Sequence, residues 1–179
     1  MVMKRLRGGG ALPPKPTFIQ LMKGLVGGSI GILILSYLGQ SSGVPWLMAP
    51  FGATCVILFA ASASPFAQPR NVIGGHFITS GVGLIALYGF GDTLVVLSLS
   101  VGVAIMLMQY FRAVHPPAGA NPLVIILAGK SAVGFEFLVT PVLLGSIVLV
   151  AIAAVINNYA EENHWPTYWH GIGQRKRQP

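Results

Sequence analysis

Long apolar stretches with almost no charge constrain the fold of this chain more than any other feature. Phe18 to Leu38 is a run of 21 residues in which Lys23 is the only charged side chain. A helix of that length rises about 30 Å, which matches the hydrocarbon thickness of a bilayer. Similar stretches cover Val72 to Phe90, Thr93 to about Tyr110, and Phe137 to Ile156. The sequence therefore predicts an all-α membrane protein with four full transmembrane helices.

The composition supports this class and argues against a nucleic-acid-binding protein. Hydrophobic residues make up 54% of the chain and charged residues only 8%, whereas soluble domains carry about 25% charged residues. The formal net charge is +7. Most of the basic residues lie in the tails and loops, where they set the orientation of a membrane protein. The lipid bilayer is thus the expected partner, and nucleic acid is not.

Two shorter apolar runs, Cys55 to Ala63 and Pro122 to Gly129, follow proline- and glycine-rich motifs. The motif Pro50-Phe51-Gly52-Ala53-Thr54 aligns with Pro117-Ala118-Gly119-Ala120-Asn121 at an offset of 67 residues. Each motif lies between two long stretches, and interrupted segments at matching positions are typical of transporter repeats. We therefore predict two short broken helices and an inverted 3+3 repeat, with halves at about 18–90 and 93–157.

The charge distribution predicts the topology. The tails 1–17 and 159–179 are both basic, so both are expected in the cytoplasm, flanking one transmembrane domain at 18–158. Six crossing segments satisfy this arrangement, and so do four spans with two re-entrant segments; we prefer six. The apolar run after Pro16 is too long for a signal peptide, which predicts a retained helix. A multi-pass protein of a bacterial or cyanobacterial plasma membrane is expected.

The broken motifs predict an anion site. If Thr54 and Asn121 cap the two short helices, with Pro122 at the first helical position, their N-termini would face each other near the midplane. Each helix N-terminus favours an anion by about 0.3–2 kcal/mol. All four carboxylate residues fall in loops or the tail, so a site for a cation is poorly supported.

Eight residues around the motifs form the predicted substrate site: Gly52, Ala53, Thr54, Arg112, His115, Gly119, Ala120 and Asn121. His115 could donate to an anion, carry a coupled proton, or simply cap backbone freed by the prolines. Arg112 could attract anions or anchor the protein in the headgroups. Arg70 is expected to be an anchor and His76 mainly structural. No cofactor or metal is expected.

These residues also carry a resemblance. His115-Pro116-Pro117 with Ala118-Gly119-Ala120, together with Ala67-Gln68-Pro69-Arg70-Asn71 and Gly74-Gly75-His76, resembles the HPP family of integral membrane proteins over about Phe18 to Ile156. The resemblance implies a transport role, and plant and cyanobacterial relatives are associated with nitrite movement. The family is described as having four transmembrane segments, so the six-segment prediction departs from that description.

The leading function is thus a transporter or channel for a small monovalent anion, with nitrite as the specific prediction. One alternative is a membrane-embedded enzyme using His115, although no Ser/His/Asp set or paired carboxylates accompany it. Another is a non-transporting scaffold. Glycine-lined helix faces would suit a homo-oligomer.

Overall fold

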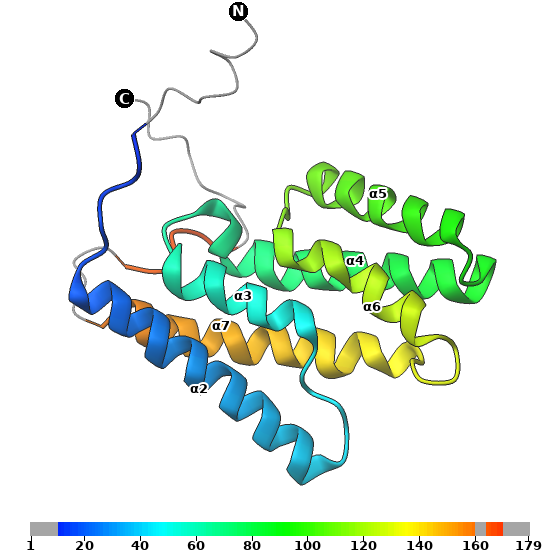
Figure 1. The fold of residues 1–179 in the computed structure, drawn as a ribbon, viewed down its shortest axis with the longest axis horizontal. Helices are drawn as coiled ribbons and strands as arrows, with labels where there is room; N and C mark the ends of the chain where they lie inside the picture. Colours follow the sequence, from blue (N-terminus) through cyan, green and yellow to red (C-terminus); the bar gives the residue numbers. More distant parts are fainter. Residues whose placement is uncertain (1–10, 160–163, 170–179) are drawn as a thin grey trace, which may run out of the picture.

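A computed structural model describes residues 11–159 and 164–169 of the chain. This part of the chain is all-helical and contains no strand. Its six α-helices are α2 (Phe18–Ser42), α3 (Ala49–Ala60), α4 (Pro69–Phe90), α5 (Leu94–Tyr110), α6 (Asn121–Ala128) and α7 (Leu144–Asn157) (Figure 1). Short 3₁₀ turns η1 (Pro65–Ala67), η2 (Pro116–Ala120) and η3 (Phe135–Leu138) and a π-helical turn η4 (Val139–Leu143) connect them.

Three helical stretches in the described residues are long and apolar enough to cross a membrane. They are α2 with 25 residues, α4 with 22, and Phe135–Asn157 with 23, which joins η3, η4 and α7. Helix α5 has 17 residues and is a shorter apolar helix. The prediction of an all-α protein with long apolar spans is confirmed, while a full fourth span remains a prediction.

The beginnings of α2 and α4 and the end of α7 lie at one end of the bundle. Lys23 Nζ donates to the Asn157 carbonyl at 3.1 Å, and the Thr167 backbone N–H donates to Gln68 Oε1 at 2.8 Å. At the opposite end, Lys130 Nζ donates to the Tyr88 carbonyl at 3.4 Å. The basic cluster at 175–177, on which the topology prediction partly rests, lies outside the described residues.

Helix α2 packs through one of its two interleaved glycine pairs. A Cβ on Gly31 would lie 3.0 Å from Leu149 Cδ2, and one on Gly27 would overlap the Phe59 ring. Gly24 and Gly28, on the other pair, have open space around them. The absence of side chains at Gly27 and Gly31 therefore lets α2 lie against α3 and α7, as small-residue spacings allow in membranes.

The predicted helix caps are wrong. Helix α3 begins at Ala49 after Met48, so Thr54 is its sixth residue, and α6 begins with Asn121 without a side-chain cap. Pro50 and Pro122 explain this, because proline fits the first turn of a helix where its missing N–H costs nothing. Ala120 already has helical backbone angles (φ −83°, ψ −12°), so no extended residue remains to act as a cap. Only α6 brings its first turn to the site described below.

Candidate functional site

Four polar side chains from separate segments meet in the interior. Thr54 comes from α3, His76 from α4, His115 from the connection before η2, and Asn121 from the start of α6. Each of the four is 0% exposed. We call these four residues the polar cluster. Buried polar groups are costly unless hydrogen-bonded, so their contacts define what the cluster can do.

The Thr54 hydroxyl joins the two imidazoles of the polar cluster. Its Oγ1 lies 2.8 Å from His76 Nε2 and 2.9 Å from His115 Nε2. The centroids of the two rings are 5.0 Å apart. On its other side, His115 Nδ1 donates to the Phe66 carbonyl of η1 at 2.8 Å. One hydroxyl therefore bridges two histidines that lie 39 positions apart in the chain.

Asn121 holds the far side of the His76 ring. Its Nδ2 lies 3.0 Å from His76 Nδ1, 2.9 Å from Ser80 Oγ and 3.1 Å from Thr79 Oγ1, so its two N–H groups are shared among these acceptors. The buried Oδ1 of the same amide has no hydrogen-bond partner among the described residues. The amide thus satisfies its nitrogen and leaves its oxygen unpaired.

The sequence of α4 explains why the polar cluster forms. His76, Thr79 and Ser80 are spaced three and four residues apart, so they share one face of the helix, and all three are buried. Gly75, on the same face, lets the His115 segment approach closely. A Cβ there would lie 2.7 Å from His115 Cβ and 3.0 Å from the Ala113 carbonyl.

A set of cationic and polar groups lies beside the cluster at the end of the bundle where α4 begins. Arg70 Nη2 donates to the Phe111 carbonyl at 2.7 Å, and Arg70 Nε donates to the Arg112 carbonyl at 3.2 Å. The Tyr168 hydroxyl donates to Asn71 Oδ1 at 2.8 Å. Burial raises the pKa of Tyr168, and the positive charges of Arg70 and Arg112 oppose that rise. The surroundings of this end are thus electropositive.

The family model for the HPP transmembrane region matches residues 13–166. The chain belongs to this family. A Dictyostelium discoideum protein named only as a transmembrane protein is 33% identical over 166 residues, covering 88% of this chain and 58% of the relative. A second transmembrane protein of that organism is 31% identical over 175 residues, covering 93% and 56%. The chain thus spans less than two thirds of the length of these relatives. No solved structure matches it.

In this HPP protein the predicted site residues separate into two groups. Thr54, His115 and Asn121 meet in the polar cluster. The others lie around it or on the surface: Gly119 and Ala120 are half-buried in η2, whereas Gly52, Ala53 and Arg112 are exposed. Of the predicted site residues, the fully buried ones are therefore the last residue of each aligned motif and the histidine of the His-Pro-Pro triad.

Sequence reasoning underrated His76, which touches two other members of the cluster. The signal was present, because an ionisable residue inside a span is a functional-site candidate by default. The hydroxyls of Thr79 and Ser80 at the third and fourth positions after it strengthen that signal. No group of three or more His, Cys, Asp or Glu that could hold a metal ion occurs in residues 11–159 and 164–169.

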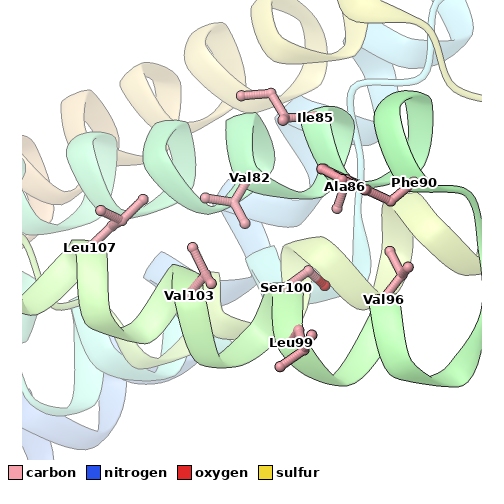
Figure 2. A pocket seen from close by; sticks show the side chains of 9 residues that line it. All are labelled: Val82, Ile85, Ala86, Phe90, Val96, Leu99, Ser100, Val103 and Leu107. Atoms are coloured by element: carbon pink, nitrogen blue, oxygen red, sulfur yellow. The ribbon is translucent and has the colours of Figure 1, made fainter.

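A separate apolar groove of about 390 Å³ runs between α4 and α5 (Figure 2). Its lining residues are Val82, Ile85, Ala86, Phe90, Val96, Leu99, Ser100, Val103 and Leu107. Only Ser100 contributes a polar side chain, and its hydroxyl already donates to the Leu97 carbonyl at 2.8 Å. The groove therefore offers apolar contact, while the hydrogen-bonding chemistry is concentrated in the polar cluster.

Proposed function

We propose that this HPP family member is a transporter or channel for a small monovalent anion, with nitrite as the specific substrate. The observation that carries the proposal is the polar cluster itself. The cluster is fully buried in a membrane protein. Its members are two uncharged side chains and two histidines, which are uncharged when the imidazole is neutral. Buried polar and ionisable groups within membrane domains usually mark substrate or ion pathways.

The charges around the cluster favour an anion over a cation. Each of the four ring nitrogens of His76 and His115 faces a hydroxyl, an amide or a carbonyl rather than a carboxylate. Arg70 and Arg112 make the nearby end of the bundle electropositive, which attracts anions and raises their local concentration. The half-buried Gly119 and Ala120 lead from this end to Asn121. We propose that the anion contacts the backbone N–H groups there.

The topology belongs to the same proposal. α2–α3–α4 and α5–α6–α7 each place a short helix between two longer helical stretches, which supports an inverted repeat. The basic residues of the two tails favour a cytoplasmic location for both. Helix α5 would complete the fourth span together with its flanking residues. Assignment to a bacterial or cyanobacterial plasma membrane remains a proposal, since the matched relatives come from Dictyostelium discoideum. A homo-oligomer is compatible with the open glycines of α2.

Gly119→Leu tests the path at a position where an added Cβ meets no neighbour. A Cβ at Gly119 meets nothing within 4 Å, and the same is true of Gly102 on the exposed face of α5. We expect Gly119→Leu to reduce nitrite uptake into proteoliposomes about tenfold or more, the equivalent of about 1.4 kcal/mol in the barrier. Gly102→Leu should leave uptake at the parent level. Unchanged uptake in Gly119→Leu, with both variants folded, would exclude the proposed path.

The enzyme alternative gains one observation from the structure. Thr54 Oγ1 and His115 Nε2 lie 2.9 Å apart, within the range for a nucleophile and its base. However, His115 Nδ1 is oriented by a backbone carbonyl rather than by a carboxylate. We therefore keep the proposal that the protein is not an enzyme. Turnover of a substrate by purified protein that is lost in Thr54→Val would overturn it.

A further inference from the structure

We propose that His76, Thr54 and His115 form a proton relay through the polar cluster, so that the anion crosses together with a proton. The inference rests on the proposed anion transport and adds to it the coupling ion and its route. It follows from the order in which protons must lie along four hydrogen bonds of this site.

The direction of donation along this row of hydrogen bonds is fixed at the end where His115 meets the Phe66 carbonyl. The Phe66 carbonyl can only accept, so His115 Nδ1 carries a proton and, in the neutral ring, His115 Nε2 accepts. Donation of the single Thr54 hydroxyl proton to His115 Nε2, rather than to the Pro50 carbonyl at 3.2 Å, satisfies that buried nitrogen. Consequently His76 Nε2 must donate to Thr54 Oγ1, and His76 Nδ1 accepts from the Asn121 amide. In this order each of the four ring nitrogens has a hydrogen-bond partner of the opposite kind.

The imidazoles of His76 and His115 are expected to be neutral in the ground state of the relay. Both imidazoles are 0% exposed, and a buried charge without a counter-charge is costly. The polar atoms facing them come from Thr54 on α3, Phe66 on η1 and Asn121 on α6, all uncharged. Cys55, the neighbour of Thr54, faces α2, where its Sγ would lie 3.4 Å from a Cβ on Gly31. Arg70 is turned to the carbonyls that follow α5.

A proton can pass along these hydrogen bonds so that each N–H or O–H bond that breaks is matched by one that forms. A proton from the conjugate acid of the transported anion binds to His76 Nδ1, and the Nε2 proton of the same ring moves to Thr54 Oγ1. The original Thr54 proton moves to His115 Nε2, and His115 releases its Nδ1 proton toward the end of the bundle that carries η1. One proton enters and one leaves, and both rings change tautomer.

Asn121 is suited to permit this reversal. In the starting state its Nδ2 faces His76 Nδ1 while its buried Oδ1 has no partner in the described residues. A half-turn of the amide would present the oxygen to a protonated His76 Nδ1 and to the hydroxyls of Thr79 and Ser80. Thr54 has a comparable freedom, because the Pro50 carbonyl at 3.2 Å is an additional acceptor for its hydroxyl. Two amide orientations thus correspond to two tautomers of His76.

The test measures nitrite and protons together in proteoliposomes, with a pH-sensitive dye inside and protein-free liposomes subtracted. A nitrite gradient across parent protein should move about one proton per anion, since the relay carries a single proton each way. Thr54→Val should lower the proton-to-anion ratio about tenfold, and Thr54→Ser, which keeps a hydroxyl, should restore it. Nitrite flux without proton movement in the parent would overturn the relay alone. No nitrite flux would overturn the proposed function as well.

A second measurement keeps the relay testable if Thr54→Val does not fold. The ¹⁵N spectrum of the parent protein, labelled at histidine, reports which ring nitrogen carries the proton. The relay requires opposite tautomers at neutral pH, with the proton on Nε2 of His76 and on Nδ1 of His115. The same tautomer in both rings would contradict the proposed proton order, whatever the flux.

Discussion

Thr54 and Asn121 occupy the same place in the two aligned motifs, yet they reach the polar cluster in different ways. Thr54 is the sixth residue of α3, whereas Asn121 is the first residue of α6. Even so, the two side chains bind opposite nitrogens of one ring, Thr54 at His76 Nε2 and Asn121 at His76 Nδ1. The aligned motifs therefore correspond in what they contact, and they differ in where the helix starts.

The two residues also differ in which buried groups lose a hydrogen-bond partner when each side chain is removed. Thr54 is the hydroxyl partner of Nε2 in both rings. Asn121 contacts Thr79 and Ser80 as well as His76, and those hydroxyls can turn to carbonyls of their own helix. Thr54 is thus the less replaceable of the pair.

This contrast predicts unequal costs for two shape-conserving substitutions. Thr54→Val orphans two buried imidazole nitrogens and should destabilise the protein by about 2–3 kcal/mol. Asn121→Leu should cost only about 1 kcal/mol, because it orphans one ring nitrogen, His76 Nδ1, while Thr79 and Ser80 can re-pair. Unfolding of both variants in detergent, monitored by circular dichroism, measures the two values. An equal or reversed order would remove the proposed asymmetry between the two motifs.

Gly75→Ala sharpens the comparison, because it acts only on the Thr54 side of His76. The added methyl would lie 2.7 Å from His115 Cβ, so the His115 segment must shift away, at a cost of about 1–2 kcal/mol. Gly52→Ala is the matched control on the exposed face of α3, where a Cβ meets nothing within 4 Å. The control should be neutral or slightly stabilising. Similar melting temperatures for the two variants would contradict the close approach at Gly75.

The sequence was sufficient for the features that depend on composition and spacing. The apolar run from Phe18 predicted α2, and the interrupted stretches predicted two short helices, because helix length and proline placement follow from local chemistry. Three of the residues that it selected for the substrate site, Thr54, His115 and Asn121, lie together in the interior. The resemblance carried by His115-Pro116-Pro117 pointed to the family that the comparisons confirm.

The pairing across the bundle could not be predicted from local pattern. The joining of His115 to Thr54 depends on how the segment before η2 packs on Gly75 and on where α3 places Thr54, which are tertiary effects. His76 was underrated because helical spacing from Arg70 says nothing about contacts with other segments. The cap predictions at Thr54 and Asn121 were wrong because the prolines near each helix start fixed the first turn elsewhere.

Nitrite flux in proteoliposomes tests the central claim, that the polar cluster lies on an anion path, most directly. We expect the parent protein and Tyr110→Ala, whose side chain is exposed on α5, to carry nitrite down its gradient. His115→Ala should carry it about tenfold more slowly or not at all, because it removes the ring that Thr54 and the Phe66 carbonyl hold in place. Parent-level flux in folded His115→Ala would contradict the account.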